Sequence, residues 1–140
     1  MDIRELDLLR AISEETHINF EQIAWAVLDH DTLREVISDS GLKEARDWFT
    51  YLPSCSGLRN LALRRWESFI TQFDDACEMI EFTHCCDAEV QKIALQCYLK
   101  TAKTIPELKQ VIVEAKDFPL VKRDALRKLV DVYCSEHSNR

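Results

Sequence analysis

The sequence predicts an all-helical protein with a single domain over residues 1–140, and three observations support this fold class. Only two glycines and three prolines occur in 140 residues, whereas a many-stranded β protein needs turn-forming residues at every hairpin. Apolar residues recur along the whole chain at the i, i+3, i+4 and i+7 spacing of amphipathic helices. The alternation of apolar and polar residues that marks strands is nowhere sustained.

Nine helices are expected, separated by capping residues and short connections. Their ranges are 2–13, 19–29, 32–38, 42–51, 57–70, 72–83, 88–101, 105–116 and 118–134. Asn19 is placed to cap the second of them. Thr32 and Glu35 have the spacing of a capping box, in which the hydroxyl and the carboxylate each accept a bond from a free backbone N–H group. Thr104 and Glu107 have the same spacing.

The later helix boundaries are marked by acidic residues and prolines. Asp87 and Asp117 are placed to cap the helices near 88–101 and 118–134. Pro106 falls in the first turn of its helix, where a missing N–H group costs nothing. Residues 53–57, with a proline, two serines and a glycine, mark the clearest break in the middle of the chain.

An internal repeat connects the helices of the second half. Shifting residues 58–73 by 32 positions overlays them on 90–105, and a further shift of 31 continues the match. The aligned small residues are Ala62, Ala94 and Ala125, and the aligned large residues one turn later are Trp66, Tyr98 and Leu129. A two-helix unit cannot bury its own apolar face, so we expect stacked units with the alanines at close helix contacts.

Residues 89–95 and 120–126 carry an apolar and a basic residue followed by Ala-Leu, which resembles the second helix of HEAT-like repeats. The resemblance covers 57–134, and 20–56 fit a degenerate first repeat with an extra helix. It implies a short right-handed stack of antiparallel helical hairpins, an α-solenoid that acts as a binding module and brings no catalytic residues. An irregular helical bundle is the alternative fold.

Charge and hydropathy narrow the location and the partners. The net charge of -7 disfavours indiscriminate nucleic-acid binding. Residues 1–89 hold 19 acids and 8 bases, a net of -11, whereas 90–140 hold 6 acids and 10 bases, a net of +4. No apolar run approaches the ~18–20 residues that span a bilayer, and the N-terminus lacks signal-peptide features. We therefore expect an acidic cytoplasmic protein with reduced cysteines and no membrane contact.

Two clusters of charge are candidate binding surfaces. The candidate basic surface consists of Arg59, Arg64, Arg65, Lys92, Lys122, Arg123 and Arg127. In a solenoid these residues can line up as one stripe that contacts nucleic-acid phosphates. The candidate acidic surface consists of Asp74, Asp75, Glu78 and Glu81. It suits a basic protein surface, or an inhibitor that mimics nucleic acid, and solvated helix faces are the alternative for both clusters.

No catalytic, metal or cofactor site is predicted. His84, Cys85, Cys86 and Asp87 form the one dense cluster of potential metal ligands in the sequence, and Cys134 and His137 form a separate Cys-x-x-His pair. Their spacing does not fit a closed zinc site. Adjacent residues at a helix end point in different directions, so His84 is poorly placed to activate Cys85. With two glycines in the chain, a Gly-rich phosphate loop is not expected either.

The sequence therefore predicts a non-enzymatic interaction module, an adaptor or inhibitor that binds another protein. The alternative is a HEAT-like module that binds the nucleic-acid backbone through the basic stripe. Neither prediction fixes an oligomeric state.

Overall fold

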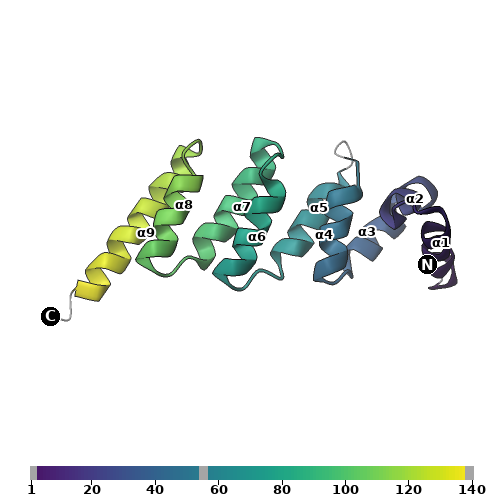
Figure 1. The fold of residues 1–140 in the computed structure, drawn as a ribbon, viewed down its shortest axis with the longest axis horizontal. Coiled ribbons are helices and arrows are strands. Elements are labelled where there is room, and N and C mark those ends of the chain that lie inside the picture. Colours follow the sequence, from purple (N-terminus) through teal and green to yellow (C-terminus); the bar gives the residue numbers. More distant parts are fainter. Residues whose placement is uncertain (1–2, 54–56, 138–140) are drawn as a thin grey trace. The chain divides into compact units, whose positions relative to one another are not determined.

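The protein is helical throughout the residues that the structure describes, which are 3–53 and 57–137. This computed structural model has nine α-helices and no strand within those ranges, which confirms the all-α class. The chain divides into two compact units, Met1–Phe69 and Ile70–Arg140 (Figure 1). The prediction of a single domain stays a prediction. Within the described ranges, every helix is too short or too polar to span a bilayer.

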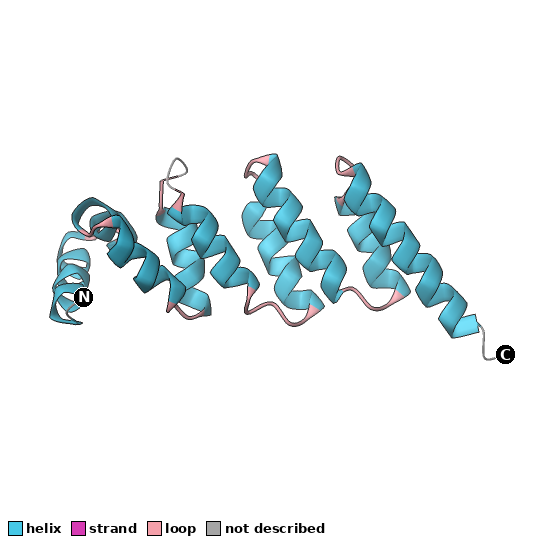
Figure 2. Cartoon of the chain, turned by 180° about the vertical axis from the view of Figure 1, so that it is seen from behind, coloured by secondary structure: helices cyan, strands magenta, loops and turns pink. Residues whose placement is uncertain are grey.

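The first unit contains five helices. They are α1 (Ile3–Thr16), α2 (Phe20–Val27), α3 (His30–Ser38), α4 (Leu42–Tyr51) and α5 (Leu58–Glu67). Helices α4 and α5 form the most extensive contact in this unit, and α3 packs against both of them. Helix α2 contacts α4, and α1 contacts α2 (Figure 2).

The second unit contains four helices that pack as two pairs. They are α6 (Phe73–Thr83), α7 (Ala88–Thr101), α8 (Ile105–Glu114) and α9 (Pro119–His137). Helix α6 lies along α7, and α8 lies along α9 (Figure 1). The two pairs meet through α7, which contacts both α8 and α9.

The helix starts differ from the predictions in the first unit. The capping box predicted at Thr32 is wrong, because α3 begins one turn earlier, at His30. Asp29 is the N-cap, and its carboxylate accepts a bond from the Thr32 amide at 2.7 Å. Asn19 does precede α2, but its side chain makes no capping bond. The break predicted around Pro53 separates α4 from α5, and its serines lie outside the described residues.

The caps in the second unit agree better with the sequence. Asp87 caps α7 by accepting the Val90 amide at 3.0 Å. The capping box of Thr104 and Glu107 is confirmed at the start of α8. A further box, which the sequence analysis missed, joins Gln72 to Asp75 at the start of α6. It was missed because the usual Ser or Thr is replaced by Gln.

Aromatic side chains form the core of the first unit. The rings of Phe49 and Trp66 lie with centroids 5.8 Å apart and join α4 to α5. Trp48 meets Phe20 edge-on at 5.7 Å and joins α4 to α2. Burying side chains of this size removes a large apolar area from water, so these contacts hold the short helices of the unit together.

Two arginines of α5 reinforce that unit. Arg59 Nε donates to the Phe49 carbonyl at 3.0 Å, and its guanidinium lies 4.4 Å from the centroid of the Phe49 ring. Arg65 Nε donates to the carbonyl of buried Ser40 at 2.7 Å. Carbonyls at and beyond helix ends lack partners within the helix. The two guanidiniums therefore satisfy acceptors that would otherwise lose water without replacement.

The residues that the predicted repeat aligns can be compared by their burial. Ala62, Ala94 and Ala125 are all fully buried, as expected for close helix contacts. Trp66 and Tyr98, the large residues one turn later, are buried as well. Leu129, at the third such position, is only half-buried. Among the three aligned large residues, Leu129 is therefore the least buried, and the repeat itself stays a prediction.

Candidate functional site

The outer face of α9 combines apolar and basic side chains along one open groove of about 660 Å³. The residues that line this α9 groove are Pro119, Lys122, Arg123, Leu126, Arg127, Val130 and Asp131. Their spacing of three, four and seven residues places them on one side of the helix. A single helix thus supplies the whole surface.

The inner face of α9 determines which side chains reach solvent. Ala125 is fully buried, and Lys128 Nζ donates to the Leu99 carbonyl at 2.9 Å, near the end of α7. Partial burial lowers the pKa of Lys128. Because these residues fix one side of α9 against α7, the side that carries Leu126 and Val130 faces outward.

The exposure of Leu126 differs from that of the residue that the predicted repeat aligns with it on α7. Leu126 is 43% exposed, whereas Leu95, the equivalent residue of α7, is 3% exposed. Leu95 lines a cavity together with Phe118, which immediately precedes α9. The following helix pair thus lies next to Leu95. On α9, Val130 is 59% exposed and Tyr133 is 55% exposed. Contiguous exposed apolar surface of this kind is typical of interaction sites.

Positive charge surrounds the apolar part of the groove. Lys122, Arg123 and Arg127 are all exposed. Within residues 3–53 and 57–137, none of the three forms an ion pair. Their charges are therefore available to an acidic ligand, and Asp131 is the single acid that lines the groove.

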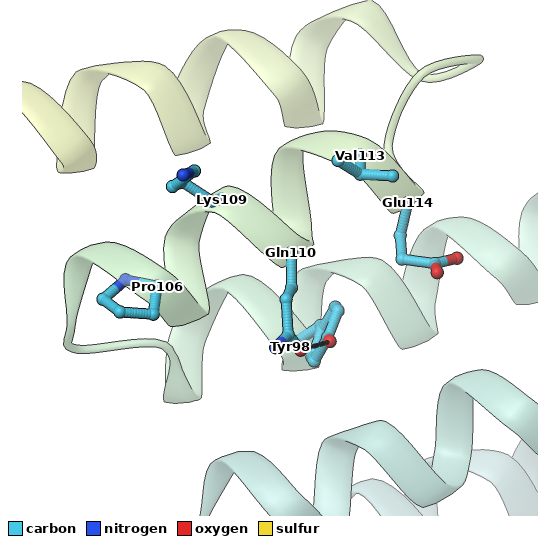
Figure 3. A pocket seen from close by; sticks show the side chains of 6 residues that line it. All are labelled: Tyr98, Pro106, Lys109, Gln110, Val113 and Glu114. Carbon is cyan, nitrogen blue, oxygen red and sulfur yellow. Dashed lines mark hydrogen bonds between the residues drawn. The ribbon is translucent and has the colours of Figure 1, made fainter.

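A second hollow, of about 440 Å³, lies along the outer side of α8 (Figure 3). Tyr98 lies at its base, stacked on Phe73 with the ring centroids 4.5 Å apart. The Tyr98 hydroxyl donates to Gln110 Oε1 at 2.9 Å and accepts a weak bond from the Cys77 thiol at 3.7 Å. Burial raises the pKa of Tyr98 far above its usual range. This hydroxyl therefore stays protonated and serves as a structural link between α6, α7 and α8.

A third hollow, of about 490 Å³, contains His84 and Glu114. The backbone around His84 is held by Gln91, whose Nε2 donates to the His84 and Cys86 carbonyls at 2.8 Å each. Residues 84–87, the cluster of potential ligands in the sequence, thus form the turn between α6 and α7. In the described part of the chain, no three His, Cys, Asp or Glu side chains are grouped as metal ligands.

The basic residues singled out by the sequence lie in different environments. Arg59 and Arg65 bind carbonyls, and Arg64 pairs with Glu67 at 2.9 Å, all within the first unit. Lys92 is exposed on α7, in the second unit, as are the three basic residues of the α9 groove. The single basic stripe stays a prediction, because its members are divided between two units.

The acidic residues singled out by the sequence all lie on α6. Asp75 serves the start of the helix, because its Oδ2 accepts the Gln72 amide at 3.2 Å. Asp74, Glu78 and Glu81 are exposed. Their use as a binding surface stays a prediction.

Sequence reasoning missed an amphipathic surface on α1. Leu8 is 60% exposed and Ile12 is 37% exposed. Glu5 and Glu15, also exposed, flank them on the same side of the helix, and these four residues are called the acidic α1 face. Leu9 turns the other way and is buried. The signal in the sequence was an apolar pair four residues apart that lies off the buried stripe.

Comparison of the chain with protein-family models, with curated proteins and with solved structures found no match.

Proposed function

We propose that this protein is a non-enzymatic helical-repeat interaction module, an adaptor or inhibitor that binds another protein in the cytoplasm through the α9 groove. The observation that carries the proposal is the exposure of Leu126 and Val130 between basic side chains. Protein interfaces combine an apolar centre with a polar rim and are enriched in arginine. Arg123 and Arg127 supply guanidinium groups that match carboxylates geometrically. An acidic, partly apolar protein surface is the matching partner.

The scaffold proposed for this module is a HEAT-like, right-handed stack of helical hairpins. The repeat spacing of 31 and 32 residues and the full burial of Ala62, Ala94 and Ala125 support it. In the second unit, the contacts of α7 with both α8 and α9 are those expected between neighbouring repeats. On this view, the face of α9 that corresponds to a buried face of α7 is exposed, and a further element can pack on it.

The test is an affinity pull-down from a lysate of the source cells, with the complete chain as bait. The groove variants are Arg123→Glu/Arg127→Glu and Val130→Asp. Matched controls are Lys109→Glu/Lys116→Glu, which changes the net charge equally on exposed residues elsewhere, and Val113→Asp, at an apolar residue of α8 that is 68% exposed. A protein captured by the wild type and both controls, but lost with both groove variants, is expected. Capture that ignores the groove variants contradicts the proposal.

Binding to a nucleic-acid backbone is the second candidate function. The observation in its favour is that Lys122, Arg123 and Arg127 are exposed on α9 and form no ion pair within the described residues. Gel shifts at increasing salt, starting from about 50 mM, test this candidate. Three phosphate contacts give a log–log slope of the binding constant against salt of roughly -2.7 on duplex DNA. Phosphate recognition requires Arg123 and Arg127, and it tolerates Val130→Ala, which removes apolar surface without adding a charge. Absence of a shift at the lowest of these salt concentrations rules the candidate out.

A further inference from the structure

Two faces of this chain are complementary in charge and similar in chemistry. The acidic α1 face presents Leu8 and Ile12 between Glu5 and Glu15. The α9 groove presents Leu126 and Val130 beside three bases. In each case two apolar side chains four residues apart are flanked by charges, and the signs are opposite. The α1 face thus carries two carboxylates, whereas the α9 groove carries three basic side chains and the single acid Asp131.

We propose that α1 of one copy packs on the α9 groove of a second copy, so that the protein associates head to tail. The proposal rests on the proposed role of the α9 groove as a protein-binding face, and it names the occupant. Apolar contact between the two helices removes the exposed Leu and Val side chains from water. Glu5 and Glu15 then supply carboxylates to the arginines that have no ion pair among the described residues.

On α7, the residue that the predicted repeat aligns with Leu126 lies next to the following helix pair. Leu95 of α7 is buried and shares a cavity with Phe118 of the next helix pair. Leu126 is its equivalent on α9 and is left in solvent. An incoming α1 therefore occupies, between copies, the place that the next pair occupies within the second unit.

The proposed interface is heterologous, because the two contacting surfaces differ. Such interfaces give rings or open chains rather than closed symmetric dimers. The contact is small, so its dissociation constant falls in the weak range, roughly micromolar to millimolar. An acidic partner protein would compete with α1 of the second copy for the same groove.

Sedimentation velocity of the complete chain, from about 10 μM to 1 mM, tests the proposal. Measurements use about 150 mM salt, where the Debye length of roughly 8 Å screens repulsion between copies of net charge -7. The wild type is expected to grow in mass with concentration. Leu8→Asp and Val130→Asp, at residues of nearly equal exposure, are each expected to weaken association about tenfold or more. Val113→Asp is the control and associates as the wild type does.

Mixing the two variants gives the sharpest result. Leu8→Asp retains an intact groove, and Val130→Asp retains an intact α1 face, so a 1:1 mixture is expected to form a dimer that does not grow further. Reversing the charges on both faces checks independently that lost association is not caused by misfolding of a variant. Arg123→Glu/Arg127→Glu is expected to remain monomeric alone and to associate with Glu5→Lys/Glu15→Lys.

Three outcomes overturn the head-to-tail contact. They are a wild type that stays monomeric at about 1 mM, association that survives Leu8→Asp, and mixtures that remain monomeric. None of them decides the proposed function, because that function is tested separately, by whether the pull-down captures another protein through the groove. Conversely, successful complementation without any captured partner supports self-association and removes the adaptor role.

Discussion

Replacing Ala94 with Leu should destabilise the second unit, because Ala94 is fully buried where α7 packs against its neighbours. Ala94 is fully buried, and its neighbours Val90, Ile93 and Tyr98 are buried on the same helix. Helix α7 also packs against α6, α8 and α9. The three additional carbon atoms of Leu must then displace a helix or force strained rotamers, which costs about 1–3 kcal/mol of unfolding free energy.

Urea denaturation followed by far-ultraviolet circular dichroism measures this effect. With a slope of about 2 kcal/mol per molar urea, the midpoint of Ala94→Leu should fall by roughly 0.5–1.5 M. Lys92→Leu, two residues away and exposed, is the matched control, because it introduces the same side chain on the same helix. It should change the stability by less than about 0.5 kcal/mol. Tryptophan fluorescence is unsuitable, since Trp25, Trp48 and Trp66 all lie in the first unit.

If Lys92→Leu proved more damaging than Ala94→Leu, the helical register of α7 would be wrong. The alignment of Ala62, Ala94 and Ala125 would then lose its physical basis. Equal and small effects would mean that α7 packs loosely, which contradicts the complete burial of Ala94.

Three further predictions concern contacts within the individual units. Arg65→Ala should lower the unfolding free energy by about 1–3 kcal/mol, because it leaves the Ser40 carbonyl without its donor; Arg64→Ala, at an exposed ion pair, should cost less than about 1 kcal/mol in the same denaturant titration. Hydrogen bonds from the backbone amides of residues 103 and 104 lower the pKa of Glu107 below its ordinary value of 4.5. Its contribution to stability is therefore present above pH 4.5 and is lost as the pH falls through the lower folded-state pKa. The difference in melting temperature between the wild type and Glu107→Ala should shrink over that window, and a constant difference would contradict the capping role. Tyr98→Phe should lower the unfolding free energy by about 0.5–1.5 kcal/mol, because it removes the hydrogen bonds of the hydroxyl. In an alkaline titration it should also remove the part of the tyrosine absorbance change that occurs above the usual tyrosine pKa range.

Helix positions were predictable because the signals that set them are local. The box at Thr104 and the cap at Asp87 act within one turn, and both were confirmed. The start of α3 was misplaced for an equally local reason. Both Asp29 and Thr32 suit an N-cap, and only the structure shows that Asp29 accepts the amide bond.

The arginines of α5 could not be assigned from the sequence. Arg59 and Arg65 read as surface charge, yet their acceptors are carbonyls 10 and 25 residues away in the chain. Such pairings depend on which helices meet, and no periodicity within α5 encodes them. The sequence therefore overestimated the positive charge that α5 offers to a ligand.

The sequence was enough to predict the helical class, each helix boundary to within three residues, and the inward stripe that contains Ala125. It could not determine that Leu126 and Val130 stay in solvent, because an amphipathic pattern shows that a face is apolar without showing what covers it. On α7 the aligned Leu95 is buried and lines a hollow together with Phe118, whereas on α9 Leu126 is 43% exposed. Helix formation depends on residues within a few positions, whereas burial of a helix face depends on a partner that only the tertiary structure supplies.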